Sequence, residues 1–162
     1  LQTFETASLK ELQKEMPNTP KILLLWVGEG SIEPKSKQTF AESGEPTKAA
    51  YYAKQEPKDA AEFEKWVDEA KSLGAIGTGP SAELTAHGDQ SYTDLVKPEM
   101  NTLTHDKGLL VHVYTVDEPV DFEKVMKAGV DGIFTNRAAE LLKFYKRWPS
   151  SSVQDLLNDH KY

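Results

Sequence analysis

The segment Gly108–Asp117, GLLVHVYTVD, followed after one short helical stretch by Gly129–Asn136, GVDGIFTN, decides the fold. Leu109–Val116 is short, apolar and rich in β-branched residues, which is typical of a strand buried on both faces of a parallel sheet. A helix is predicted from Asp117 and Pro119 onward, because proline tolerates the first helical position and acidic residues favour the helix N-terminus. Strand, helix and strand in so short a span predict a parallel sheet or barrel, whose functional residues lie at the carboxyl ends of the strands.

The rest of the chain repeats this alternation. Apolar runs predict further strands at 1–4, 21–27, 75–77 and 133–135, and apolar stripes predict helices carrying 9–16, 63–73, 96–103 and 141–147. We expect Thr6 to cap the first of these helices and Thr78–Pro80 to turn the chain. Residues 28–58, rich in glycine, proline and charge, predict an excursion after a strand end, partly ordered around Phe40 and two tyrosines. Five strands alternating with helices imply right-handed crossovers and a parallel sheet.

Composition excludes several classes of protein. The formal net charge of −7 argues against a polyanion-binding protein, so we expect no nucleic-acid partner. No apolar run approaches the roughly 20 residues of a membrane span. The absence of cysteine excludes disulfides and thiolate metal sites.

The length of the chain suits one domain. Its 162 residues fall short of the about 250 of a complete (β/α)8 barrel. The sequence also starts inside a predicted strand at Leu1, without an initiator Met, which predicts a piece of a longer protein.

The same segments resemble a known family. VHVYTVDE, followed at this interval by AGVDGIFTN, is similar to the C-terminal signature of the glycerophosphodiester phosphodiesterases, in which an aromatic-Thr-Val segment precedes Gly-Val-Asp-Gly-Ile-x-Thr-Asp/Asn. Leu1–Glu5 resembles the Gln-Ser-Phe strand of that family, with Thr3 in place of Ser. The segments occur in family order, and the resemblance covers residues 1 to about 147, which correspond to the C-terminal part of the family's barrel.

The resemblance implies a fold and an activity. Residues 1–147, with the excursion 28–58, would form the C-terminal portion, about five strands, of an α/β (β/α)8 TIM barrel, and 148–162 a C-terminal tail. The family hydrolyses glycerophosphodiesters to sn-glycerol 3-phosphate and an alcohol with a divalent cation, Ca²⁺ or Mg²⁺. Its His-Arg, Glu-x-Asp and Glu-x-Lys motifs and its second catalytic His are missing here. We therefore expect the complete protein to be an enzyme, and this segment alone to be inactive and to bind no metal.

The resemblance also implies which residues bind substrate. Phe4 and Tyr114 match the family positions that place aromatic rings beside the glycerol, and Gln2 lies on the same strand face as Phe4 by the two-residue period. A plain core role is an equally favoured alternative for Tyr114. For His112, on the same face as Tyr114, a hydrogen-bonded core role is favoured over a catalytic one. No catalytic residue is assigned in this segment.

The remaining polar candidates have simpler explanations. A divalent cation needs several carboxylates from neighbouring strand ends. Asp117 is better explained as a helix cap, and Glu5 as part of a solvated rim. Arg137, near the place where many barrels bind phosphate, is expected to make an ion pair at the rim. Trp26 is expected in the core.

A different class of function stays open. An incomplete parallel sheet exposes two strand edges and an apolar face, so the chain is alternatively a non-catalytic α/β module that self-associates or binds a partner through these edges. A homo-oligomer is expected in that case. The family resemblance slightly favours a periplasmic or secreted location for the complete protein.

Overall fold

The computed structural model describes residues 1–27 and 38–147. Within them, one parallel sheet holds five strands in chain order: β1 (Gln2–Thr3), β2 (Ile22–Leu25), β3 (Gly77–Pro80), β4 (Leu110–Val113) and β5 (Gly132–Ile133). The helices are α1 (Thr6–Glu15), α2 (Phe40–Ser43), α3 (Lys48–Ala53), α4 (Ala60–Ser72), α5 (Pro98–Asp106), α6 (Pro119–Lys127) and α7 (Ala138–Phe144), with a 3-10 helix, η1 (Thr85–Gln90). The predicted five-stranded parallel sheet is confirmed.

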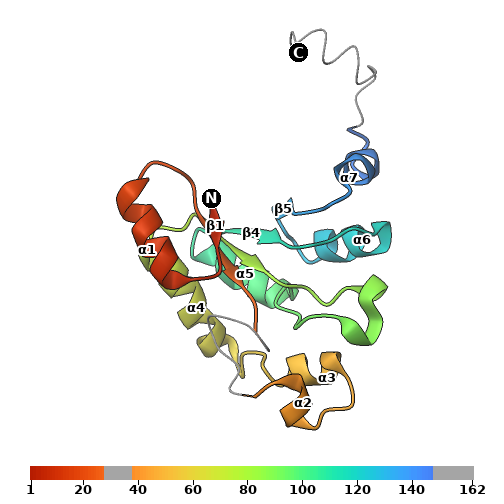
Figure 1. The fold of residues 1–162 in the computed structure, drawn as a ribbon. Coiled ribbons are helices and arrows are strands. Elements are labelled where there is room, and N and C mark those ends of the chain that lie inside the picture. Colours follow the sequence, from red (N-terminus) through yellow and green to blue (C-terminus); the bar gives the residue numbers. More distant parts are fainter. Residues whose placement is uncertain (28–37, 148–162) are drawn as a thin grey trace.

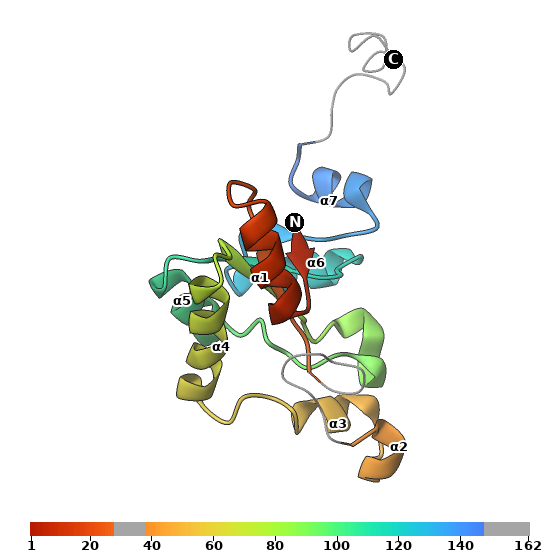
Figure 2. The same ribbon diagram turned by 60° about the vertical axis from the view of Figure 1, so that its left-hand side comes forward.

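One face of the sheet is covered by helices (Figures 1 and 2). Leu23 and Leu25 of β2 pack in one apolar cluster with Leu9 of α1 and Val67 of α4. A second cluster joins the end of β4 to α6, and Phe122 is fully buried in it. The helices thus bury only part of the apolar stripes that the sequence predicts: Phe63, Val67 and Phe122 are buried, but Met16, Leu142 and Tyr145 are exposed. The buried part is the main force that holds the helices on the sheet.

The opposite face, which we call the inner face, carries the other alternate side chains of each strand. Gln2, Ile22, Gly77 and Leu110 are in register across four strands, so they point to this same side. Leu110 is 40% exposed there. The described part of the chain therefore leaves a portion of the inner face uncovered.

The third strand lies further along the chain than predicted. β3 begins at Gly77 and includes Gly79 and Pro80, where the sequence predicts a turn. Its pairing with β2 runs on past Pro80, because the Ser81 N–H donates to the Leu25 carbonyl at 3.0 Å. A Cβ added at Gly77 would lie 2.9 Å from Cδ1 of Ile22. The glycines therefore make room for the large side chains of β2, which explains why a segment with few apolar side chains forms a central strand.

The helix starts agree with prediction in part. α5 and α6 have proline in the first turn, and Oδ1 of Asp59 accepts a hydrogen bond from the Glu62 N–H at 2.8 Å, which caps α4. The prediction that Thr6 caps α1 is wrong, because the capping position is one residue earlier, at Glu5, and it makes no side-chain cap. β4 is also shorter than the predicted 109–116, although a parallel bridge between Ser81 and Tyr114 extends its pairing.

The excursion between β2 and α4 holds α2 and α3, which lie apart from the longer helices, and α3 contacts η1 (Figures 1 and 2). Rings of Phe40, Tyr51 and Tyr52 contact one another, at 5.8 Å and 5.3 Å between centroids, so the predicted order around these residues is confirmed. The Thr93 hydroxyl donates to the Tyr52 carbonyl at 2.8 Å and anchors α3 to the segment after η1. Residues 28–37 of the excursion and the tail 148–162 lie outside the described residues. No helix in the described ranges is both long enough and apolar enough to cross a membrane.

Candidate substrate-binding site

A cavity of about 350 Å³ opens where the carboxyl ends of β1, β4 and β5 meet on the inner face. It is lined by Gln2, Phe4, Leu24, Tyr114, Thr115, Phe134, Thr135 and Asn136. The three residues that the sequence predicts for substrate binding, Gln2, Phe4 and Tyr114, therefore lie in one cavity. Their role in binding stays a prediction.

Aromatic rings form one side of this site. Phe4 and Tyr114 meet edge to face, with ring centroids 5.6 Å apart and planes at 88°. The Tyr114 hydroxyl donates to the Leu25 carbonyl at 3.0 Å, which fixes the ring. Burial, with the nearby Tyr92 as a smaller cause, raises the pKa of Tyr114 well above its usual value. The ring is thus a rigid, neutral wall, with structural contacts as well as a face in the cavity.

The aromatic contacts continue beyond the cavity. Trp26 lies 6.3 Å from Phe4 and 6.0 Å from Tyr92, between ring centroids. The prediction that Trp26 belongs to the core is only partly right: its ring is half-buried at the rim, although its Nε1 is buried and has no partner among the described residues. Tyr92 was missed by sequence reasoning, because it lies in a polar segment with no periodic pattern.

Polar side chains line the rest of the cavity, and Asp117 organises them. Its carboxylate accepts hydrogen bonds from the Thr135 hydroxyl at 3.0 Å, the Asn136 N–H at 2.7 Å and the Asn136 side-chain amide at 2.9 Å. The prediction that Asp117 caps α6 is therefore wrong, and the capping position is Glu118, without a side-chain cap. Burial alone would raise the pKa of Asp117, but the hydrogen bonds from Asn136 and Thr135 and the charge of Arg137 outweigh it and lower this pKa.

The other rim residues agree with their predictions. Arg137 Nη1 lies 3.0 Å from Oε1 of Glu118, so the predicted ion pair at the rim is confirmed. Glu5 is exposed, as predicted, and accepts a hydrogen bond from the Ser8 hydroxyl at 3.0 Å. Phe134, Thr135 and Asn136 are not among the predicted substrate-binding residues, although the quoted sequence signature ends in them. Only the pairing of β4 with β5 brings them beside Tyr114.

The described histidines are dispersed. His105 Nε2 is 2.8 Å from a carboxylate oxygen of Asp131, and His87 lies beside the ring of Tyr92. His112 contacts the Phe134 ring at 6.2 Å between centroids, and the internal hydrogen bond expected for it is not found in residues 1–27 and 38–147. His160 lies outside those ranges. Each described histidine thus has its own surroundings, and none is placed in a catalytic pair.

A divalent cation, which the sequence comparison implied for the complete protein, does not fit the donors described here. Among residues 1–27 and 38–147, no group of three or more His, Asp and Glu side chains is arranged to hold a metal. The strand-end carboxylates are engaged elsewhere, Asp117 with Asn136 and Glu5 with Ser8. Glu29, the carboxylate that follows the predicted strand 21–27, lies outside the described residues. The described residues therefore do not by themselves form a site for a divalent cation.

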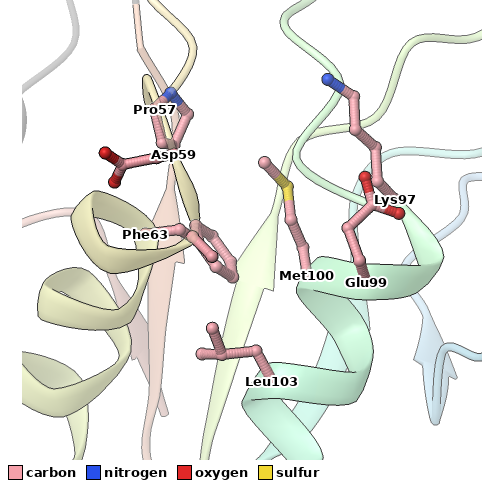
Figure 3. A pocket seen from close by; sticks show the side chains of 8 residues that line it. Pro57, Asp59, Phe63, Lys97, Glu99, Met100 and Leu103 are labelled. Atoms are coloured by element: carbon pink, nitrogen blue, oxygen red, sulfur yellow. The ribbon is translucent and has the colours of Figure 1, made fainter.

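A second cavity, of about 200 Å³, lies between α4 and α5 (Figure 3). Phe63 of α4 faces Met100 and Leu103 of α5 across it, while the charged ends of Asp59 and Lys97 turn away from this apolar floor. Asp59 caps α4 and Lys97 is paired with Glu56, so both charges already have partners. The cavity is on the helix-covered side of the sheet, away from the polar strand ends, and it is a packing feature rather than the candidate site.

Comparison with known proteins identifies the family. The model of the glycerophosphoryl diester phosphodiesterase family matches residues 1–140. The chain belongs to this family. No curated protein sequence matches it.

Solved structures confirm the fold. A protein described as a glycerophosphoryl diester phosphodiesterase from Silicibacter pomeroyi DSS-3 is 22% identical, with a TM-score of 0.53, and the match covers 91% of this chain and 39% of that one. A glycerophosphodiester phosphodiesterase from Parabacteroides distasonis ATCC 8503 is 20% identical, with a TM-score of 0.51, and the match covers 90% of this chain and 42% of that one. These family members are TIM barrels, so the predicted fold class, a portion of a TIM barrel, is confirmed. The chain spans about two fifths of their length.

Proposed function

We propose that this chain is the C-terminal part of a glycerophosphodiester phosphodiesterase and supplies the glycerol side of its active site. The observation that carries the proposal is the cavity at the strand ends, in which Phe4, Tyr114 and Phe134 face polar side chains. A polyol has hydroxyl groups along a carbon chain, so it can bind aromatic faces and hydrogen-bonding groups together. In TIM barrels this end of the sheet holds the active site.

The division of roles follows from the residues present. Gln2, Phe4 and Tyr114 would bind and orient the glycerol and keep water away from it, since a rigid aromatic wall excludes solvent. The family's divalent cation, Ca²⁺ or Mg²⁺, would supply charge stabilisation at the phosphate, held by the N-terminal strands of the complete barrel. Those strands would also carry the acid and base groups. The substrate is then a small glycerophosphodiester, and a periplasmic or secreted location belongs to the same proposal.

The test compares this chain with a complete protein that contains it. The complete protein should release sn-glycerol 3-phosphate from glycerophosphocholine in the presence of Ca²⁺ or Mg²⁺, and the 162-residue chain should release none above a blank without protein. Activity of the chain alone would contradict the division of roles. An inactive complete protein, tested with both metals and several headgroups, would contradict the proposed reaction.

A second candidate, a module that self-associates, is favoured by the uncovered inner face. Leu110 and Phe134 are 40% and 37% exposed on it, and β1 and β5 are the edges of the sheet in the described residues. Light scattering at high protein concentration should then show a dimer or larger species, and Leu110→Lys should return the chain to a monomer. Val120→Lys on α6 is the matched control, because Val120 is also exposed, at 53%, but lies on a helix. A monomeric wild-type chain would exclude this candidate.

A further inference from the structure

The side-chain amide of Asn136 has a fixed orientation. Its Nδ2 donates to one oxygen of Asp117 at 2.9 Å, while its backbone N–H donates to the other oxygen at 2.7 Å. An ionised carboxylate only accepts hydrogen bonds, so the NH₂ end of the amide must face Asp117. The carbonyl oxygen, Oδ1, is therefore the end that turns away from Asp117. No donor reaches this oxygen among the described residues.

The neighbouring Thr135 is not equivalent to Asn136. Its hydroxyl donates its only hydrogen to Asp117 at 3.0 Å and accepts the Arg137 N–H at 2.9 Å, so it has no hydrogen left for a ligand and one lone pair remains. Asn136 lines the same cavity and keeps one free acceptor. The amide of Asn136 cannot rotate to present its NH₂ group to the cavity. Its oxygen can therefore pair only with a ligand group that donates a hydrogen.

We propose that Asn136 is a specificity-determining residue whose Oδ1 accepts a hydrogen bond from a free hydroxyl of the substrate's glycerol, with Asp117 as the residue that positions it. This inference rests on the proposed function and goes beyond it, because it assigns one protein atom to one class of substrate group. A substrate in which that hydroxyl is missing or blocked has no donor to offer, and leaves the amide oxygen unpaired against the ligand. Because Asn136 is exposed at the rim, its oxygen can be partly hydrated, and the resulting preference is moderate.

The experiment measures kcat/KM in the complete protein for three substrates. They are glycerophosphocholine and its two monodeoxy analogues, built on propane-1,2-diol and on propane-1,3-diol, each of which lacks one glycerol hydroxyl. Asn136→Ala should lower kcat/KM for glycerophosphocholine by about tenfold. For one of the two analogues the same variant should change kcat/KM by less than about twofold, because the group that Asn136 binds is already absent. Asn18→Ala, at an exposed asparagine between α1 and β2, is the matched control and should change none of these values.

Exchange of the two residues tests the positioning role of Asp117. Asn136→Asp alone places two carboxylates together and should lower kcat/KM for glycerophosphocholine at least as much as Asn136→Ala. The double variant Asp117→Asn, Asn136→Asp keeps an amide opposite a carboxylate, and an acceptor oxygen in the cavity, so it should recover most of the loss.

The outcomes separate this inference from the proposed function. Equal losses on all three substrates in Asn136→Ala would overturn the specificity role, because a merely structural residue affects them alike. Failure of the exchange to recover activity would overturn the positioning role. A wild-type complete protein that hydrolyses none of the three substrates would overturn the proposed function, and the inference with it.

Discussion

The carboxylate of Asp117, at the end of β4, accepts the backbone N–H of Asn136, at the end of β5, at 2.7 Å. The two residues are 19 apart in sequence, and the intervening segment contains α6. The same carboxylate also binds the Thr135 hydroxyl and the Asn136 amide. Asp117 therefore holds the two strand ends together and fixes the polar side of the cavity, in addition to the sheet pairing between His112 and Gly132.

Replacement of Asp117 by Ala should destabilise the protein by about 1–2 kcal/mol, because several charge-assisted hydrogen bonds are lost at a partly exposed site. This loss corresponds to a Tm decrease of about 3–6 °C for a domain of this size. Thermal unfolding followed by circular dichroism measures it. Glu118→Ala is the control: it removes only the exposed ion pair with Arg137 and should change Tm little. A smaller effect of Asp117→Ala than of Glu118→Ala would contradict the structural role.

Asp131 should make the protein sensitive to acid. Burial opposes ionisation of Asp131, but the hydrogen bonds from the Val111 N–H and His105 and the charges of His105 and His112 outweigh it, and its pKa is below the ordinary 3.8. The unfolded chain therefore binds this proton more readily than the folded one. The stabilisation is present above about pH 4 and is lost as pH falls through the lower, folded pKa.

The measurement for Asp131 is the free energy of unfolding in urea between pH 3 and pH 7. Asp131→Asn should reduce the fall in stability on the acid side, since the titrating group is gone. The control is Asp89→Asn, at an exposed position in η1, which should leave the fall in stability at low pH as in the wild type. If the free energy of unfolding falls with decreasing pH equally in the wild type and in Asp131→Asn, groups other than Asp131 cause the loss of stability.

Two substitutions of Tyr114 should separate the role of its ring from that of its hydroxyl in the complete protein, if the proposed activity holds. Tyr114→Phe removes the hydrogen bond to the Leu25 carbonyl and should cost about 1 kcal/mol of stability with little change in kcat/KM. Tyr114→Ala removes the wall of the cavity and should lower kcat/KM by about tenfold or more, a loss of roughly 1.4 kcal/mol in transition-state binding. If Tyr114→Ala keeps full kcat/KM and only lowers Tm, Tyr114 is a core residue and its assignment to the site is wrong.

Alanine at the inner-face glycines should have unequal effects. A Cβ at Gly77 would lie 2.6 Å from the backbone carbonyl oxygen of Leu110, which cannot move without disturbing β4. At Gly79 the closest atom is a terminal methyl of Leu24, a side chain that can change rotamer. We expect Gly77→Ala to cost about 3 kcal/mol and Gly79→Ala nearer 1 kcal/mol. Urea denaturation of both variants measures the difference, and equal costs would show that β3 and β4 can separate slightly.

The sequence alone determined the alternation of the five strands with the longer helices and the buried face of several of those helices. Leu109–Val116 predicts a buried strand, Pro119 a helix start and Phe122 the buried side of that helix, because each depends on backbone preferences and on the spacing of neighbours in the chain. The resemblance to the family signature predicted, in addition, that these elements form a portion of a TIM barrel. Gln2, Phe4 and Tyr114, which line one cavity, could be named together from the same signature and strand period.

Only the tertiary structure decided which strand ends share a cavity and what each polar group binds. Asp117 looks like a helix cap in sequence, yet its partners are Thr135 and Asn136, because the pairing of His112 with Gly132 brings the next strand end within reach. The sequence predicts a turn at Thr78–Pro80, yet Gly77–Pro80 is a strand, and side chains of β2 occupy the space beside its glycines. Register and packing between distant segments set these contacts, and no local pattern in the chain encodes the distance between two strand ends.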